Sequence, residues 1–173
     1  MKEEGENMII YLDMDGVIAD FDSALDKLGI DKELDDVEEK IKEIAVESDD
    51  FFNTLEKFST SEELVEYVRK VSKGEWGICS TPLRGDRGNS ARWKAVWLKE
   101  NGFTPPEKEN MIFTCNKTKW ATANGKSNIL IDDKAKNVVA WEKAGGIGIR
   151  YHANLDSLSY LKRMLNYAIK VAI

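Results

Sequence analysis

A short apolar run, residues 8–12, leads directly into the sequence Asp-Met-Asp-Gly at residues 13–16. A strand that ends in this way presents Asp13 and Asp15 on the same side, because successive side chains of a strand alternate between its two faces. Gly16 then lets the backbone turn away sharply. Two carboxylates this close repel each other unless a cation lies between them, and ligation by oxygen alone favours Mg²⁺. The alternative interpretation of these four residues is an ordinary Asp-Gly turn.

The composition is that of an ordinary globular protein. The 173 residues are 42% apolar and 32% charged, which suits one domain with a moderate insertion or a small cap. The net charge of −6 gives no support for a general nucleic-acid binder, so no long nucleic acid is expected as a partner. Cys79 and Cys115 each end an apolar run and predict no disulfide framework. No apolar stretch is long enough to span a membrane and no signal peptide is recognised, which predicts a cytoplasmic protein without membrane contact.

Outside residues 20–73, short apolar runs alternate with helical stretches. Strands are expected at residues 8–12, 75–79, 110–114, 128–131 and 147–151. Helices are expected at residues 90–101, 135–144 and 155–172. Short apolar strands separated by helices are typical of a parallel sheet that is covered on both faces. The sequence therefore predicts an α/β, Rossmann-like doubly wound sheet of about five strands.

The segment 20–73 breaks this alternation, because it has helical periodicity and no convincing strand. Helices are expected at residues 20–28, 32–47 and 62–73. The last of them begins at a predicted capping box formed by Thr60 and Glu63. An all-helical insertion directly after the first strand predicts a small cap over the carboxyl end of that strand. The chain then divides into an α/β core, residues 1–19 and 74–173, and a helical cap, residues 20–73.

Polar side chains follow four of the expected strands. In a doubly wound sheet, ligands bind at the carboxyl ends of the strands, near the point where the strand order reverses. In chain order these ends carry Asp13 and Asp15, Ser80 and Thr81, Lys117 and Lys119, and Asp132 and Asp133. Each pair has an ordinary alternative, such as a loop start, a solvated charge or a helix N-cap. Acid, hydroxyl, cation and acid in this order nevertheless predict one site that binds both a cation and an anion.

These motifs resemble those of the haloacid dehalogenase (HAD) superfamily of phosphohydrolases, and within it the chain looks most like the 5'(3')-deoxyribonucleotidases. The matching stretches are residues 12–21, Phe51-Phe52 with Leu55, residues 78–83, Lys94 with Trp97, residues 113–118 and residues 130–133. The first and last stretches carry the resemblance to the superfamily. The nucleotidase branch rests on the stretches between them.

The resemblance implies a Mg²⁺-dependent phosphomonoesterase that forms an aspartyl-phosphate. Asp13 would be the nucleophile, which divides one displacement into two steps. Asp15 would protonate the leaving alkoxide and later deprotonate the attacking water. The Asp13 carboxylate, the Asp15 backbone carbonyl and Asp133 would hold Mg²⁺, with Asp132 placed behind these ligands. The implied substrate is a small phosphate ester, most simply a (deoxy)ribonucleoside monophosphate.

Further residues would bind the substrate. The phosphate group would be bound by Ser80, Thr81, Lys117 and Lys94. Phe21 would form part of an apolar wall against the nucleobase, whereas Phe51 and Phe52 suit either that wall or the core. Lys119 competes with Lys117 for the phosphate, because the stretch between Lys117 and Asp132 is longer than the nucleotidase pattern leads us to expect.

Three alternatives stay open at this point. The first is that the substrate is another small phosphorylated metabolite or a nucleic-acid end. The chemical core is shared among such phosphatases, and the cap selects the substrate. A phospho-accepting receiver domain also gathers acids, a hydroxyl and a lysine at strand ends, but it needs neither the Asp-x-Asp motif nor the helical insertion. An inactive fold retained for binding is the third. The sequence leaves the oligomeric state open, and a homodimer is compatible with it.

Overall fold

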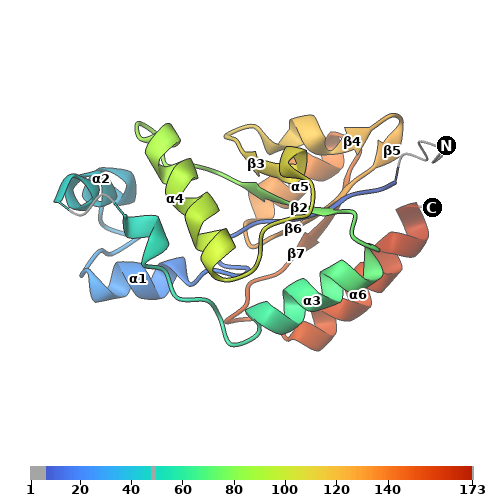
Figure 1. Ribbon diagram of the computed structural model, residues 1–173, viewed down its shortest axis with the longest axis horizontal. Helices are drawn as coiled ribbons and strands as arrows, with labels where there is room; N and C mark the ends of the chain where they lie inside the picture. Colours follow the sequence, from blue (N-terminus) through green and yellow to red (C-terminus); the bar gives the residue numbers. More distant parts are fainter. Residues whose placement is uncertain (1–6, 48–49, 173) are drawn as a thin grey trace.

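The computed structural model describes residues 7–47 and 50–172, and its centre is a parallel sheet of five strands. Across the sheet the strands are β3 (Met111–Phe113), β2 (Trp76–Ser80), β1 (Ile10–Leu12), β6 (Ile129–Asp132) and β7 (Ile147–Arg150) (Figure 1). The chain passes from β1 to β2 and β3 on one side and then returns to β6 and β7 on the other. This order confirms the predicted doubly wound α/β sheet, with its reversal point beside β1.

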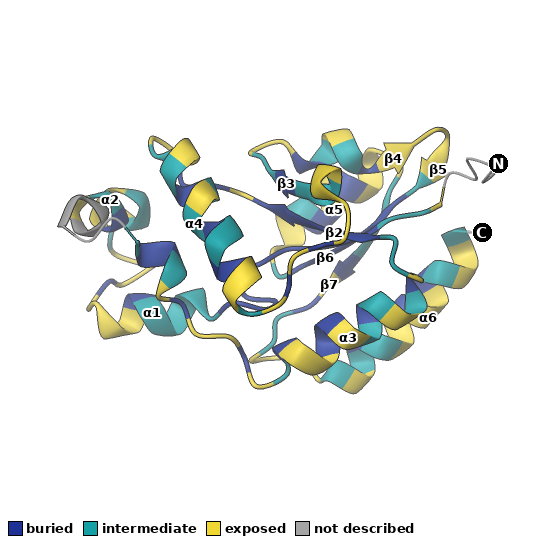
Figure 2. Cartoon of the chain, in the orientation of Figure 1, coloured by how far each residue is buried: buried dark blue, intermediate teal, exposed yellow. Residues whose placement is uncertain are grey.

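Alternate side chains of the strands enter two separate cores. On one face, Ile10 and Leu12 of β1 pack with Ile78 and Ile131. On the other face, the core consists of Tyr11, Cys79, Ile112, Ala121, Leu130 and Trp141. The central strands β1, β2 and β6 are dark blue in Figure 2 because both of their faces are covered, which explains why they are nearly continuous apolar runs.

Four helices form the two covering layers. They are α3 (Ser61–Val71), α4 (Arg87–Glu100), α5 (Ala135–Lys143) and α6 (Leu158–Ala172). Buried side chains of α3, α4 and α6 join the first core, whereas Trp141 of α5 belongs to the second. In the described part of the chain, no helix has both the length and the apolar character needed to cross a membrane.

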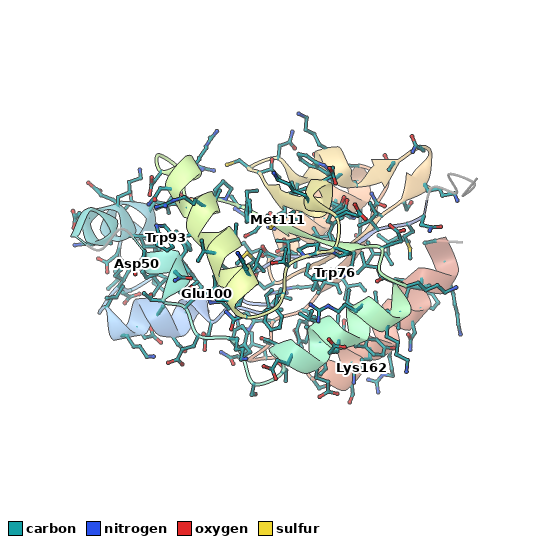
Figure 3. All side chains as sticks on the ribbon, viewed as in Figure 1. Asp50, Trp76, Trp93, Glu100, Met111 and Lys162 are labelled. Atoms are coloured by element: carbon teal, nitrogen blue, oxygen red, sulfur yellow. The ribbon has the colours of Figure 1, made fainter. Side chains whose placement is uncertain are left out.

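Helix α3 lies within the segment that the sequence assigned to the cap, but it packs beside α6 on the sheet (Figure 1). Two side chains labelled in Figure 3 mark this layer. Trp76 at the start of β2 lies against α3, with the Arg69 guanidinium 5.5 Å from its ring centroid, and Lys162 of α6 forms a 2.6 Å ion pair with Glu63 of α3. We therefore propose that the cap ends before α3, rather than at residue 73.

The cap contains α1 (Phe21–Lys27), α2 (Val37–Glu47) and the short 3₁₀ helix η1 (Phe51–Asn53). Helix α2 begins five residues later than the range 32–47 predicted. Carboxylates explain the difference, because Asp31 accepts a hydrogen bond from the backbone N–H of Glu33, and Asp35 accepts one from that of Asp31. Such local bonds compete with a helix and favour a turn.

The capping box predicted at the start of α3 is wrong in its mechanism. Thr60 is the N-cap residue, but its backbone is already in the right-handed helical region and its side chain makes no capping hydrogen bond. Instead, the Ser61 hydroxyl donates a 2.7 Å hydrogen bond to the backbone carbonyl of Ile18. The helix start is thereby tied to the loop that follows the Asp-x-Asp motif.

A two-stranded hairpin was not predicted. It consists of β4 (Thr122–Ala123) and β5 (Lys126–Ser127), which pair antiparallel. Asn124 and Gly125 form its turn with positive φ angles of 51° and 79°, and the Asn-Gly dipeptide is a strong hairpin signal. The hairpin accounts for the long stretch between Lys117 and Asp132.

Candidate active site

The carboxyl ends of β1, β2 and β6 lie at the same level, because these strands pair in parallel register. This brings together Asp13, Asp15, Ser80, Thr81, Asp132 and Asp133, and Lys117 joins them from η3 (Lys117–Trp120) after β3. A backbone hydrogen bond of 2.9 Å from Asp13 N to the Ile131 carbonyl fastens the end of β1 to β6. The four predicted strand ends therefore meet at one place.

Lys117 is a buried cation beside Asp13. Its ammonium lies 3.1 Å from Asp13 Oδ1 and 2.7 Å from Asp132 Oδ2, and all three side chains are buried. Burial alone would lower the pKa of Lys117, but the carboxylates of Asp13 and Asp132 outweigh it and hold that pKa above its usual value. Lys119 is exposed and lies over the ring of Trp120, so the geometry favours Lys117 over Lys119 for the phosphate.

Asp132 orients this lysine. Its carboxylate accepts hydrogen bonds from the Lys134 backbone N–H at 2.9 Å and from the Asn137 amide at 3.0 and 3.2 Å, in addition to Lys117. The sequence did not predict Asn137, although it lies in the first turn of α5, the helix that follows Asp133. Three donor groups leave Asp132 little capacity for a metal, which fits the position behind the ligands that the resemblance implied.

Asp13 and Asp133 suit a cation. Carboxylate oxygens of Asp13, Asp132 and Asp133 lie within 4.8 Å of one another. Asp133 Oδ1 is buried without a hydrogen-bond partner, and such an atom is costly unless something binds it. Gly16 lets Asp133 approach, because a Cβ atom there would lie 2.5 Å from Asp133 Oδ2. The donor set consists of oxygen alone and therefore fits Mg²⁺.

Asp15 projects into the site beside Lys94 of α4. The Lys94 ammonium is fully buried and donates to Asp15 Oδ2 at 2.9 Å, to Ser80 Oγ at 2.9 Å and to the Thr81 carbonyl at 3.1 Å. The second carboxylate oxygen of Asp15, Oδ1, is buried and has no partner. Lys94 was expected to bind phosphate, but it does not line the cavity onto which Asp13, Asp15 and Lys117 open.

A cavity of about 400 Å³ opens onto these groups, within the range of small-molecule sites. Asp13, Asp15, Lys117, Asp133 and Thr81 line its core side. Phe21 and Phe52 line its cap side, and their rings are stacked with centroids 6.3 Å apart.

The cap contributes further side chains to this cavity, namely Val37, Ile41, Asp22, Lys32 and Glu38. The polar members of this set were not predicted. Phe51 contacts both phenylalanines but is buried and does not line this cavity.

Comparison with solved structures finds the same architecture in several enzymes. A candidate β-phosphoglucomutase from Thermotoga maritima has a TM-score of 0.52 at 16% identity, and the match covers 95% of this chain and 99% of that one. A haloacid dehalogenase-like hydrolase from Streptococcus pneumoniae has a TM-score of 0.50 at 14% identity, covering 93% and 90%. A HAD-family enzyme from Bacteroides thetaiotaomicron, solved as an aspartate-to-alanine mutant with magnesium and inorganic phosphate, has a TM-score of 0.50 at 13% identity, covering 90% and 98%.

The chain therefore has the fold of HAD hydrolases. No protein-family model and no curated protein matches the sequence. At identities this low the likeness establishes the fold and not the activity, and none of the three structures is described as a deoxyribonucleotidase.

The acidic cluster predicts a measurable cost to stability. Burial and the charges of Asp13 and Asp132 raise the pKa of Asp133 to about 8. Between its unfolded pKa near 4 and this value, the folded state binds a proton that the unfolded state lacks, so without metal the protein loses stability as the pH rises through this window. We expect Asp133→Asn to raise the unfolding free energy of the metal-free protein at pH 8 by on the order of 1–3 kcal/mol.

In Mg²⁺ we expect wild type to become more stable than Asp133→Asn. At about 100 times its Kd, a ligand that binds only the folded state adds about 2.7 kcal/mol to wild-type stability. Denaturant unfolding in EDTA and in Mg²⁺ measures both effects, with Asp26→Asn, an exposed aspartate of α1, as the matched control. Equal stabilisation of wild type and Asp133→Asn by Mg²⁺ would remove Asp133 from the metal site.

Proposed function

We propose that the protein is a Mg²⁺-dependent phosphomonoesterase that transfers the phosphoryl group to Asp13 and hydrolyses nucleoside monophosphates. The observation that carries this proposal is the pairing of two different carboxylates at the end of β1. Asp13 is buried against the Lys117 ammonium, whereas the Asp15 side chain lies against Lys94 and is 26% exposed, and both residues line the same cavity. These are the environments that a nucleophile and a proton-transfer group require.

The first step is attack on phosphorus by a carboxylate oxygen of Asp13. The new Asp13 O–P bond forms as the P–O bond to the leaving group breaks, and Asp15 gives its proton to the departing alkoxide. Lys117 places its charge beside the phosphoryl oxygens, and such placement supplies most of the catalysis in phosphoryl transfer. Asp13 and Asp133 would hold Mg²⁺, which would supply further neutralisation of that charge.

The second step releases phosphate. Asp15, now ionised, takes a proton from water, the water oxygen bonds to phosphorus, and the Asp13 O–P bond breaks. The carboxylate of Asp13 and the proton on Asp15 are thereby restored. Water reaches the phosphoryl group on Asp13 through the cavity, because Asp13 is otherwise buried against Lys117.

The aromatic wall supports a nucleotide as the substrate. The stacked rings of Phe21 and Phe52 lie in the same cavity as the phosphate-binding groups. A base stacked on an aromatic side chain gains about 1–3 kcal/mol. The cavity also has room for more than a phosphate group, and the polar cap residues Asp22 and Lys32 provide partners for base or sugar atoms.

Phe21→Ala should raise the KM for a nucleoside monophosphate by roughly 5- to 150-fold, because stacking is lost. A small phosphate without a base should be hydrolysed with an unchanged KM. Steady-state kinetics on both substrates measures the difference, with Leu28→Ala at the exposed end of α1 as the control. A similar loss on both substrates would count against the nucleotide assignment and leave the phosphatase assignment standing.

The activity itself is tested by phosphate release from a panel of nucleoside monophosphates, sugar phosphates and an aryl phosphate, with Mg²⁺ or with excess EDTA. We expect nucleoside monophosphates to be preferred and EDTA to stop turnover until Mg²⁺ is restored. Preference for sugar phosphates would redirect the substrate to another metabolite. Turnover that persists in EDTA would contradict the metal site.

A further inference from the structure

Lys94 uses all of its hydrogen-bonding capacity inside the protein. An ammonium group has three N–H donors, and the acceptors are Asp15 Oδ2, Ser80 Oγ and the Thr81 carbonyl. The ring of Phe52 covers the group, with its centroid 4.9 Å from the Lys94 nitrogen. No donor is left for a phosphate oxygen.

The site has another cation for the substrate. Lys117 lines the cavity next to Asp13, whereas Lys94 lies behind Asp15 and does not line it. The two buried lysines therefore serve different carboxylates. One lies beside the group that attacks phosphorus, and the other beside the group that moves the proton.

Lys94 makes the two oxygens of Asp15 unequal. Oδ2 is held by the ammonium at 2.9 Å, and Oδ1 is buried with no hydrogen-bond partner although the carboxylate lines the cavity. The geometry points to Lys94 as a positioning residue that fixes the Asp15 carboxylate in the orientation from which it exchanges a proton with the leaving group and with water. This inference rests on the proposed phosphomonoesterase function.

The arrangement has a physical rationale. Proton transfer needs the donor within hydrogen-bond reach of the leaving oxygen, and small misplacements of a catalytic group cost large factors in rate. A carboxylate held at one oxygen by a buried ammonium cannot rotate freely about its side-chain bonds. Burying that ammonium is costly by itself, and the three acceptors and the Phe52 ring offset the cost.

A double-mutant cycle tests the inference. Lys94→Met keeps the length of the side chain and removes its charge, Asp15→Asn removes the proton-transfer group, and the third variant carries both changes. On a nucleoside monophosphate we expect Lys94→Met to lower kcat by roughly 100-fold with KM within about 2-fold, because Asp15 loses its fixed position. In the Asp15→Asn background, Lys94→Met should change kcat by less than about 2-fold.

An activated aryl phosphate needs little protonation, so Lys94→Met should slow its first step much less than that of the alkyl ester. Lys99→Met, an exposed lysine on the same helix, is the control and should behave as wild type. Additive losses in the cycle, or a KM that rises equally on both substrates, would show that Lys94 binds phosphate and would overturn the inference.

The same variants also settle two other cases, in which Lys94→Met does not fold or the wild type is inactive. The double variant removes both charges of the buried pair, so comparing it with Asp15→Asn still decides the question if Lys94→Met alone does not fold. Equal rates would support positioning and a further loss would overturn it. A wild type that hydrolyses no phosphomonoester would instead refute the proposed function, and the inference with it, before any variant is measured.

Discussion

Asp13→Asn should lower kcat by more than about 10⁴-fold on every substrate, because an amide oxygen does not attack phosphorus. The fold should persist, since the amide is nearly isosteric and Lys117 keeps its 2.7 Å contact with Asp132. Steady-state phosphate release at saturating Mg²⁺ measures the loss, and circular dichroism with a denaturant titration checks the fold.

Saturating Mg²⁺ separates this result from a metal-binding defect. If Asp13 served only to hold the metal, raising Mg²⁺ would restore much of the activity. Asp26→Asn makes the same chemical change on the exposed surface of α1 and should retain wild-type rates. An Asp13→Asn protein that keeps more than a few per cent of wild-type turnover would remove Asp13 from the role of nucleophile.

Asp15→Asn should slow the hydrolysis of an alkyl phosphate by roughly two to four orders of magnitude, because the leaving alkoxide is no longer protonated. An activated aryl phosphate should lose much less in its first step. Its second step, attack by water, still lacks a base, so phosphorylated enzyme should accumulate. A burst of the aryl alcohol followed by slow turnover, seen by stopped-flow absorbance, is the expected signature.

The size of the loss on the two esters decides the role of Asp15. Equal losses in the first step would mean that Asp15 acts through the metal or the fold and does not transfer a proton. Ser23→Ala, which removes a hydroxyl bonded to Asp20 at the start of α1, is a control for general effects of the cap and should slow neither step.

The catalytic end of the sheet was predictable because each part has a local signal. Asp13 and Asp132 each end or follow a short apolar run, and parallel pairing places such ends at one level whatever the helices between them do. The choice between Lys117 and Lys119 had no local signal. It depends on η3, whose turn directs Lys117 inwards and leaves Lys119 exposed.

The parts that sequence reasoning missed depend on tertiary contacts. An amphipathic helix such as α3 does not reveal which surface it covers, and here it packs beside α6 rather than over the cavity. The role of Lys94 could not be predicted for the same reason. A lysine within a helix is ordinarily solvated, and only the tertiary structure shows that this one is buried and binds Asp15. The hairpin is different, since Asn124-Gly125 was a usable turn signal.

The central claim is that Asp13 carries the phosphoryl group. Asp15→Asn protein, mixed with an aryl phosphate and Mg²⁺ and quenched in acid within the burst, can be digested and its peptides weighed by mass spectrometry. We predict one added phosphoryl group on the peptide containing Asp13, and none when Asp13→Asn is combined with Asp15→Asn. A burst without modification of Asp13, or with the phosphoryl group on another residue, would contradict the account.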